Sequence, residues 1–303
     1  MKLISNIENI QKKISSKILL NEKLSKYSWF NLGGPAKVLF KPKNLEELTI
    51  FLKEINNHNK ILVLGAGSNT LIRDGGFDGV VIKLGNSFSH LSKLDEETII
   101  AGASALDRKV SDFALENFLT GFEFLSCIPG TIGGAVRMNS GCYDNDISKI
   151  LISVQAIDLN GNVRIIKSSD VKFFYRGSNL NTDLIFLSAT FKGKKTDKSI
   201  IEKKIKNFVI KKKNDQPSKI KTCGSTFKNP INNSAWKLIK ECGCAGMKVG
   251  DAQISKKHCN FFVNNGKAKS NELEELILKV KDQVLNKTGI ELELEIKIAG
   301  EKL

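Results

Sequence analysis

Hydrophobic residues recur at two spacings along the chain, and these spacings predict a mixture of helices and strands. Apolar positions three or four residues apart predict amphipathic helices over residues 5–26, from Ala105 to Leu119 and from Asn271 to about Asn286. Short apolar or alternating runs predict strands over the ranges 37–40, 61–64, 80–84, 98–103, 151–159, 163–167, 184–191, 260–264 and 290–298.

Local signals place turns and ends within this pattern. Asn44 is the expected N-cap of a helix that begins at residue 45. Asn160-Gly161 lies between two predicted strands and is a strong hairpin signal. The charged stretch 192–198 has no apolar periodicity, and we expect a domain boundary there. The predicted parts are residues 1–27 (an N-terminal helical segment), 28–193 and 194–303.

The stretch from Ile128 to Asn145 contains four glycines and few large side chains, so a hydrophobic core does not explain it. Glycine permits turns with positive φ and close approach of the backbone to another group. Successive bare N–H groups form an anion-binding nest, which favours a phosphate ligand. A glycine-rich surface loop is the alternative.

A second glycine segment, Gly65-Ala66-Gly67-Ser68-Asn69, directly follows the predicted strand 61–64. A dinucleotide-binding Rossmann motif needs a third glycine and a helix after it. Here Thr70 stands at the third glycine position, and another strand follows. The segment therefore predicts phosphate contact without a Rossmann domain.

Composition and charge narrow the class of protein. The net charge is +15, carried by 42 lysines and only five arginines. Such a charge permits nucleic-acid binding, but the lysines are scattered and no aromatic-interleaved basic patch occurs. We expect most lysines to be solvated. Arg137 and Arg176 stand out because arginine offers a planar, bidentate fork where lysine is the rule.

The six cysteines form no CxxC pair, and only three histidines are present, so we predict no metal site and no disulfide framework. No apolar run is long enough for a membrane span, and the N-terminus lacks a signal-peptide pattern. We therefore expect a cytoplasmic enzyme.

Taken together, the motifs resemble the UDP-N-acetylenolpyruvoylglucosamine reductase family of peptidoglycan synthesis, over nearly the whole chain from Trp29 to Gly300. The motifs are Trp29-Phe30-x-x-Gly33-Gly34-Pro35-Ala36, Leu64-Gly65-x-Gly67-Ser68-Asn69, Ile128-Pro129-Gly130-Thr131-Ile132-Gly133-Gly134-Ala135, Tyr175-Arg176-x-Ser178, Gly224-Ser225-x-Phe227-Lys228-Asn229-Pro230 and Leu292-Glu293-x-Glu295. Several motifs in the same order make the resemblance specific.

The resemblance implies an α+β fold, with a two-lobed FAD-binding domain of the vanillyl-alcohol-oxidase type over 28–193 and a smaller α+β substrate-binding domain over 194–303. It implies a monomer that holds FAD non-covalently, takes hydride from NADPH and reduces UDP-N-acetylglucosamine enolpyruvate to UDP-N-acetylmuramate. Cell wall biogenesis, cell shape and cell division would depend on this product. The implied cofactor-binding residues are Gly65, Ala66, Gly67, Ser68, Asn69, Pro129, Gly130, Thr131, Gly133, Gly134 and Ala135.

Three residues match the catalytic positions of the family. Ser225 would protonate C2 of the substrate, while Arg176 and Glu295 would stabilise the enolate. Glu295 must be protonated to donate a hydrogen bond in this role. The resemblance also implies substrate contacts by Arg137, Lys213, Asn229 and His258.

The chain departs from the family pattern at two places. Leu294 stands between the terminal glutamates, where the family often has proline. No tyrosine follows Tyr175, so the chain resembles the branch without a tyrosine-bearing loop over the substrate diphosphate.

Two other functions stay open at this point. A related flavin oxidase could tether FAD covalently through histidine or cysteine, and Cys127 and Cys142 lie near the glycine motif. The net charge also permits a nucleic-acid-binding protein.

Overall fold

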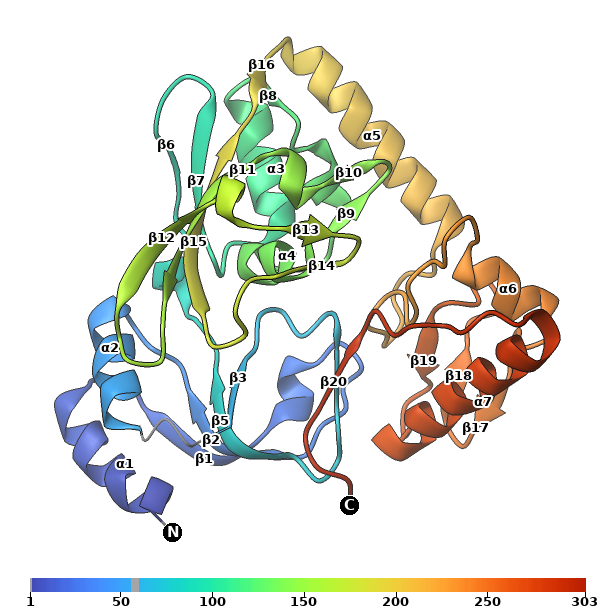
Figure 1. Ribbon diagram of the computed structural model, residues 1–303, viewed down its shortest axis with the longest axis horizontal. Coiled ribbons are helices and arrows are strands. Elements are labelled where there is room, and N and C mark those ends of the chain that lie inside the picture. Colours follow the sequence, from blue (N-terminus) through green and yellow to red (C-terminus); the bar gives the residue numbers. More distant parts are fainter. Residues whose placement is uncertain (1, 56–59) are drawn as a thin grey trace. The chain divides into compact units, whose positions relative to one another are not determined.

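The computed structural model describes residues 2–55 and 60–303, and these fall into two compact units, each discontinuous in the sequence (Figure 1). Unit 1 comprises Met1–Leu19, Val38–Gly65 and Gly79–Lys212. Unit 2 comprises Leu20–Lys37, Ala66–Asp78 and Lys213–Leu303. This division follows spatial contacts, whereas the predicted domains follow the chain, and the predicted boundary at residue 194 stays a prediction.

The regular elements mix helices with strands, as an α+β fold requires. The helices are α1 Lys2–Lys13, α2 Leu45–Glu54, α3 Asp107–Glu116, α4 Ile132–Met138, α5 Lys198–Asp215, α6 Ala235–Glu241 and α7 Ser270–Thr288. The longer strands are β1 Ile18–Lys23, β2 Pro35–Phe40, β5 Phe77–Ile82, β7 Thr98–Gly102, β11 Leu151–Ile157, β12 Val163–Lys167 and β15 Ile185–Lys192. The short strands are β3 Ile61–Val63, β4 Thr70–Ile72, β6 Leu91–Lys93, β8 Leu119–Thr120, β9 Gly141–Cys142, β10 Asn145–Asp146, β13 Phe173–Phe174, β14 Gly177–Ser178, β16 Lys194–Lys195, β17 Lys248–Val249, β18 Ala252–Ile254, β19 Phe262–Asn264 and β20 Lys297–Ala299.

The main sheet of unit 1 is antiparallel, with the strand order β12-β11-β15-β7-β6. The predicted hairpin at Asn160-Gly161 is confirmed, because β11 pairs with β12 and Gly161 has a φ of 84°. Helix α4 packs against β15 and β7 and brings the glycine-rich segment to this sheet. The core between them is rich in phenylalanine, including an edge-to-face pair of Phe122 and Phe191 with ring centroids 6.3 Å apart.

A second sheet has the order β1-β2-β5-β3, and its β3–β5 pair is parallel and lies in unit 1. Helices α1 and α2 pack on each other beside it. The predicted N-cap is confirmed, because Asn44 Oδ1 accepts a hydrogen bond from the Glu47 backbone N–H at 2.9 Å. The rings of Phe40 and Phe51 stack at 4.0 Å and join β2 to α2 in the core.

The helix predicted over residues 5–26 is wrong in its second half. Helix α1 ends at Lys13, and residues 18–23 form β1. Ser15 donates to Glu47 Oε1 from both its backbone N–H (2.9 Å) and its hydroxyl (2.7 Å), and the Ser16 hydroxyl donates to Glu47 Oε2. A carboxylate from α2 thus takes the donors that would continue the helix, and the apolar spacing alone does not show this.

Unit 2 contains the antiparallel sheet β17-β18-β19, with α7 packed on its strands and α6 packed on α7 (Figure 1). Its core includes Leu273, Leu276 and Val280 on one face of α7. The strand predicted over 290–298 is regular only at its end, where β20 pairs in parallel with β4. Upstream, Leu294 forms an isolated antiparallel β-bridge with Phe227. This pairing positions part of the site described below.

Candidate active site

The glycine-rich segment 128–135 leads into α4, whose first turn is fastened to the residues after β7. The backbone N–H groups of Ile132 and Gly133 donate to the carbonyls of Ala105 (3.0 Å) and Ala103 (2.8 Å). A Cβ on Gly133 would lie 3.2 Å from Ala103, so a larger residue would press on this contact. At Gly134 the nearest atom would be 3.9 Å away, and the residue is exposed. Gly134 therefore has the room for a ligand that Gly133 lacks.

The rest of this segment divides in the same way. Thr131 and Ala135 are buried, and the Ala135 N–H donates to the Thr131 carbonyl at 2.9 Å. The Gly130 carbonyl accepts from the Asp107 backbone N–H at 3.2 Å, which ties the loop to α3. Pro129, by contrast, is exposed. The structure thus gives the buried members a packing role and leaves Pro129 and Gly134 accessible.

The two glycines of segment 65–69 are required by contacts within the protein. A Cβ on Gly65 would lie 2.6 Å from Thr131 Oγ1, so the two glycine segments touch at this point in unit 1. In unit 2, a Cβ on Gly67 would lie 1.9 Å from the carbonyl oxygen of Tyr27. These approaches give both glycines a packing role, and their contact with a phosphate stays a prediction. Ala66 and Ser68 are half-buried.

Lys83, at the end of β5, is a candidate cofactor residue that the sequence reasoning missed. Its ammonium group donates to the carbonyl of Gly65. Burial lowers the pKa of Lys83, and the charge of Lys41 lowers it further. The only signal in the sequence is a lysine that ends the apolar strand Val80–Ile82, and lysines are too common in this chain for that signal to stand out.

These residues fit the pyrophosphate of FAD. A dinucleotide phosphate needs a backbone without side chains in the way and a nearby positive charge. Gly134 offers open space at the start of α4, and Lys83 brings an ammonium group to Gly65, which contacts Thr131 of the same loop. Among the described residues, no group of three or more His, Cys, Asp or Glu side chains is placed to hold a metal ion.

Arg176 lies at the tip of a two-residue hairpin between β13 and β14, where Phe174 pairs with Gly177. Its φ is 58°, in the left-handed region that non-glycine residues rarely adopt. The guanidinium Nη2 donates to the Gly141 carbonyl at 2.8 Å, and the group lies 4.9 Å from the ring centre of Tyr175. Strained backbone of this kind is concentrated at functional sites, which agrees with the predicted role of Arg176.

Asn139 fixes this hairpin to the end of α4, and the sequence reasoning also missed it. It caps α4 in the left-handed region, with a φ of 43°. Its side chain donates from Nδ2 to the Phe174 carbonyl (3.2 Å) and accepts at Oδ1 from the Ser148 N–H (3.0 Å). An asparagine that ends a glycine-rich helix is a recognisable C-cap, but its partners cannot be deduced from that position.

Arg137, predicted to bind substrate, is occupied by contacts inside unit 1. Its guanidinium donates to the carbonyls of Leu180 (3.0 Å), Asn181 (2.7 Å) and Leu184 (2.6 Å). It also lies 4.2 Å from the ring centre of Phe186, and burial lowers its pKa to about 10. Arg137 therefore organises the 180–184 loop, and its substrate contact stays a prediction.

Unit 2 brings Ser225 and Glu295 into one hydrogen-bonded arrangement. Ser225 forms an isolated antiparallel β-bridge with Phe261. The next residue, Thr226, donates its backbone N–H to the Asn260 carbonyl at 2.8 Å. On the other side, the carbonyl of Thr226 accepts the Glu295 N–H at 2.9 Å. Both side chains are half-buried, as a proton donor facing a ligand should be.

Asn69 joins the same arrangement. Its Nδ2 donates to the Glu295 carbonyl at 3.1 Å, and its own carbonyl accepts the Lys297 N–H at 2.9 Å. One residue before Gly224, Cys223 Sγ lies 3.4 Å from the Thr70 carbonyl. A predicted cofactor residue and two predicted catalytic residues are therefore brought together within unit 2.

The remaining predicted substrate residues, also in unit 2, lie in different surroundings. Asn229 Oδ1 accepts the Ala235 N–H at 3.0 Å and thus helps begin α6. His258 lies between Trp236 and Phe261, with ring centroids 5.7 and 4.8 Å away, and burial lowers its pKa. Its Nδ1 is buried without a hydrogen-bond partner among the described residues. Lys213 is exposed, and its carbonyl accepts from Lys257 at 2.8 Å.

Comparisons with known proteins show the family to which this chain is similar. Residues 215–299 match the family model of the C-terminal domain of UDP-N-acetylenolpyruvoylglucosamine reductase, and residues 36–167 match that of an FAD binding domain. A UDP-N-acetylenolpyruvoylglucosamine reductase from Pelagibacter ubique (strain HTCC1062) is 53% identical over 298 residues, which cover 97% of this chain and 99% of that relative. Another, from Bradyrhizobium sp. (strain ORS 278), is 42% identical over 289 residues, which cover 95% of this chain and 94% of that relative.

One solved structure is similar to this chain over nearly the whole length of this chain. The crystal structure of the corresponding reductase from Thermus caldophilus matches with a TM-score of 0.82 and 32% identity, covering 95% of this chain and all of that one (100%). The predicted fold is confirmed: an α+β protein with a two-lobed FAD-binding domain of the vanillyl-alcohol-oxidase type and a smaller α+β domain.

Proposed function

This chain belongs to the UDP-N-acetylenolpyruvoylglucosamine reductase family, and we propose that it reduces UDP-N-acetylglucosamine enolpyruvate to UDP-N-acetylmuramate for peptidoglycan synthesis. The proposed reaction is supported above all by the 2.9 Å hydrogen bond from the Glu295 backbone N–H to the Thr226 carbonyl. It holds Glu295 beside the residue that follows Ser225, so a carboxyl and a hydroxyl can serve one substrate.

A bound FAD would supply the hydride chemistry, with NADPH as the donor and C3 of the enolpyruvyl group as the acceptor. The residues that would hold its pyrophosphate are Gly134, with its open side, and Lys83, a half-buried lysine whose ammonium group lies at Gly65. The residues of segment 65–69 and of the loop 129–131 are further proposed cofactor residues, and Gly65, Gly67 and Thr131 also have a packing role.

The arrival of a hydride at C3 leaves negative charge on C2 and on the adjoining carboxylate. We assign Arg176 to the carboxylate, because a guanidinium can make two parallel hydrogen bonds to it. A protonated Glu295 would donate to the same developing enolate. The Ser225 hydroxyl would then deliver the proton to C2, which completes the reduction.

Several finer assignments are part of this proposal. Lys213, Asn229 and His258 would contact the substrate, and Arg137 would act there indirectly through the 180–184 loop. The chain would belong to the branch without the tyrosine loop, since no tyrosine follows Tyr175. We further propose a cytoplasmic monomer with the domain boundary near residue 194. No helix in the described ranges 2–55 and 60–303 is long and apolar enough to cross a membrane.

The deciding experiment is the absorbance spectrum of the purified protein through one catalytic cycle. We expect a flavin spectrum that NADPH bleaches and that UDP-N-acetylglucosamine enolpyruvate restores without oxygen. A flavin that only oxygen restores would instead indicate the oxidase alternative. Acid precipitation should release the flavin, whereas a tether through Cys127 or Cys142 would keep the pellet yellow. A colourless protein that shifts random duplex DNA would support nucleic-acid binding.

A further inference from the structure

Two of the six cysteines, Cys127 and Cys142, form a thiol pair that the proposed reaction does not use. All six cysteines are free thiols. Cys127 ends the short helix before the glycine-rich segment, and Cys142 lies in β9, which packs against that helix. The two thiols are close enough to affect each other's ionisation, and Cys142 Sγ donates to the Phe124 carbonyl at 3.4 Å. The pair therefore brackets the segment 128–141.

Polar and cationic groups surround this pair within unit 1. The Ser126 hydroxyl lies 3.7 Å from Cys127 Sγ. Lys212 comes from α5 and donates its ammonium to the Cys127 carbonyl at 2.7 Å. Arg176 acts on Cys142 electrostatically and donates to the carbonyl of the preceding residue, Gly141 (2.8 Å). A thiolate in this position is stabilised by a donor and by positive charge, which makes it nucleophilic.

The acidity of the two thiols differs in the direction that thiol oxidation requires. The pKa of Cys127 is lowered to about 6, chiefly by its interaction with Cys142. A hydrogen bond with Ser126 and the positive charge of Lys212 lower it further. The interaction with Cys127 in turn raises the pKa of Cys142, which therefore keeps its proton. These surroundings favour ionisation of Cys127 over Cys142, the order expected of a reactive cysteine and its resolving partner.

We propose that Cys127 and Cys142 are a peroxide-reactive pair that closes to a reversible disulfide. The Cys127 thiolate attacks one oxygen of hydrogen peroxide, the O–O bond breaks, and hydroxide leaves as Cys127 becomes a sulfenic acid. The Cys142 sulfur then attacks this sulfur, the S–O bond breaks, and the sulfenic oxygen takes the Cys142 proton and leaves as water. The two sulfurs lose two electrons in total, and one peroxide becomes one water and one hydroxide, which the proton that Cys127 released to solvent on ionisation converts to a second water.

Closing the disulfide also affects Arg176. Cys142 must turn from the Phe124 carbonyl toward Cys127, and Gly141, whose carbonyl holds Arg176, directly precedes it. Small displacements of a positioned group cost large factors in rate. Oxidation should therefore slow the reductase about tenfold or more. This consequence rests on the proposed role of Arg176, whereas formation of the disulfide does not.

The other cysteines provide an internal control. Burial raises the pKa of Cys223 to about 12 and also raises the pKa values of Cys244 and Cys259. They are protonated at neutral pH and should react slowly with peroxide. If peroxide oxidises all cysteines alike, these three will also lose their free thiols, whereas a specific reaction will consume only Cys127 and Cys142.

The test treats the flavin-loaded protein with a small excess of hydrogen peroxide, blocks the remaining thiols and maps the peptides by mass spectrometry. We expect a Cys127–Cys142 cross-link, a mass loss of two hydrogens and full reversal by dithiothreitol. Iodoacetamide should label Cys127 first, and the labelling rate should reach half its maximum at a lower pH than that of an ordinary thiol. Cross-links among other cysteines, or an irreversible sulfinic acid at Cys127 without a cross-link, would overturn the proposal.

Two variants complete the test. Cys142→Ser should keep its flavin, lose the cross-link and accumulate a Cys127 sulfenic acid that dimedone traps. Cys244→Ser, the matched control, should cross-link like the wild type. If the wild-type cross-link forms and turnover stays unchanged, the link to Arg176 is wrong while the disulfide itself stands. If Cys142→Ser fails to fold, cross-linking of the wild type and the position of first alkylation still decide the case.

Discussion

At the scale of single residues, the chemistry of this protein depends on what a side chain touches more than on its type. Ser225 and Glu295 are ordinary residues in the sequence, yet the backbone around Thr226 links their segments. Arg137 and Arg176 are both rare arginines, and three carbonyls occupy the first while the second stands at a strained hairpin tip. Hydrogen-bond partners and backbone conformation therefore separate a structural arginine from a candidate catalytic one.

The Ser225 hydroxyl should matter in only one half of the reaction. Reduction of the flavin by NADPH needs no proton at C2 of the substrate, so Ser225→Ala should bleach at a near-normal rate. Reoxidation by the enolpyruvyl substrate should slow by about 10²–10⁴-fold, the usual contribution of a positioned acid. Stopped-flow absorbance measures each half separately. If both halves slow together, flavin binding is damaged, and if neither slows, Ser225 is a turn residue.

Asp107 should make the protein less stable as the pH rises. It is fully buried (0% exposed), both carboxylate oxygens lack a partner among the described residues, and burial raises its pKa well above the ordinary value. Its place in the first turn of α3 favours a negative charge by at most about 2 kcal/mol, less than the several kcal/mol that an unpaired buried ion costs. The side chain is therefore neutral in the folded state.

In the unfolded chain Asp107 loses its proton above about pH 4. The folded state then binds more protons, so stability falls from about pH 4 up to the raised folded pKa. Asp107→Asn removes this ionisation and should be more stable than the wild type at pH 8, with a smaller gain at pH 5. Urea unfolding midpoints at the two pH values measure this. An equal gain at both would contradict it.

At the scale of elements, α4 and the β13–β14 hairpin together position the glycine-rich loop and Arg176. The start of α4 is fastened to the residues after β7, and its end is capped by Asn139, which also holds the hairpin that carries Arg176. Because α4 has only seven residues, a displacement of its first turn also displaces the Asn139 cap at its end. Substitutions along α4 can therefore be compared directly.

Gly134→Ala should stabilise the flavin-free protein and weaken flavin binding. Alanine favours a helix over glycine by about 1 kcal/mol, and the nearest atom to the new Cβ would be 3.9 Å away. The added methyl would occupy space that we assign to the pyrophosphate. The matched variant Gly133→Ala should destabilise the protein instead, since its Cβ would press on Ala103 at 3.2 Å. Thermal melts and flavin titrations distinguish them, and unchanged flavin affinity in Gly134→Ala would refute the placement.

Asn139→Gly should lower kcat about tenfold while flavin content stays close to that of the wild type. Glycine accepts the left-handed φ of 43°, but it cannot make the hydrogen bonds to Phe174 and Ser148 that steady the hairpin. Small losses of alignment at a catalytic group cost such factors. Asn139→Ala should lose stability in addition, because its Cβ strains the left-handed backbone. An unchanged kcat in Asn139→Gly would show that Arg176 needs no such support.

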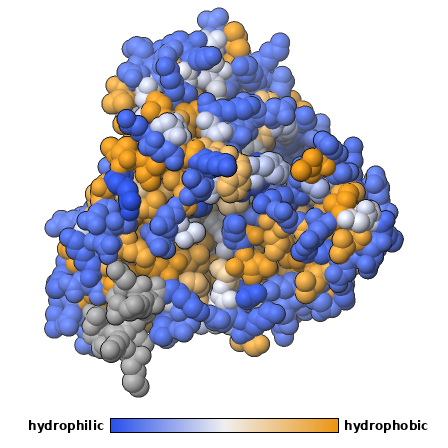
Figure 2. All heavy atoms as spheres, viewed as in Figure 1, coloured by the Kyte–Doolittle hydropathy of each residue, from blue (hydrophilic) through white to orange (hydrophobic). Residues whose placement is uncertain are grey.

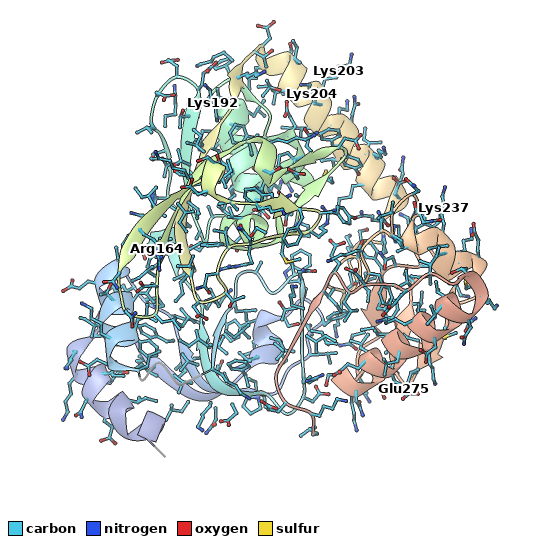
Figure 3. All side chains as sticks on the ribbon, in the orientation of Figure 1. Arg164, Lys192, Lys203, Lys204, Lys237 and Glu275 are labelled. Atoms are coloured by element: carbon cyan, nitrogen blue, oxygen red, sulfur yellow. The ribbon has the colours of Figure 1, made fainter. Side chains whose placement is uncertain are left out.

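At the scale of the whole molecule, the excess of positive charge is distributed over many elements. The labelled charges Arg164 on β12, Lys192 on β15, Lys203 and Lys204 on α5, Lys237 on α6 and Glu275 on α7 are all exposed (Figure 3). In Figure 2, hydrophilic residues are spread over the visible face, with hydrophobic atoms gathered between them. With a net charge of +15, the chain attracts anionic ligands in general.

Removal of FAD should lower the melting temperature. A ligand that binds only the folded state adds about 2.7 kcal/mol of stability at one hundred times its dissociation constant, which corresponds to roughly 5 °C for a chain of this size. Differential scanning fluorimetry of flavin-free protein across a flavin titration measures the shift. Riboflavin, which lacks the pyrophosphate, should shift the midpoint much less. Equal shifts with both would place the binding energy in the ring system.

Local features of the sequence determined much of the secondary structure. The Asn44 cap, the Asn160-Gly161 hairpin and helices α3 and α7 follow from neighbours within a few positions, because capping, turn geometry and helical periodicity act over that range. The ordered set of motifs likewise identified the family before any contact was known.

Only the tertiary structure decided which of these residues act together. Glu47 ends α1 from the next helix, Thr226 meets Glu295 across a long stretch of chain, and Asn139 reaches Phe174. It also showed that Gly65 and Gly67 serve the packing of the protein on itself. The spacing of residues along a chain records local geometry alone. Hydrogen bonds between distant segments form when the core packs, and their partners leave no periodic signal in the sequence.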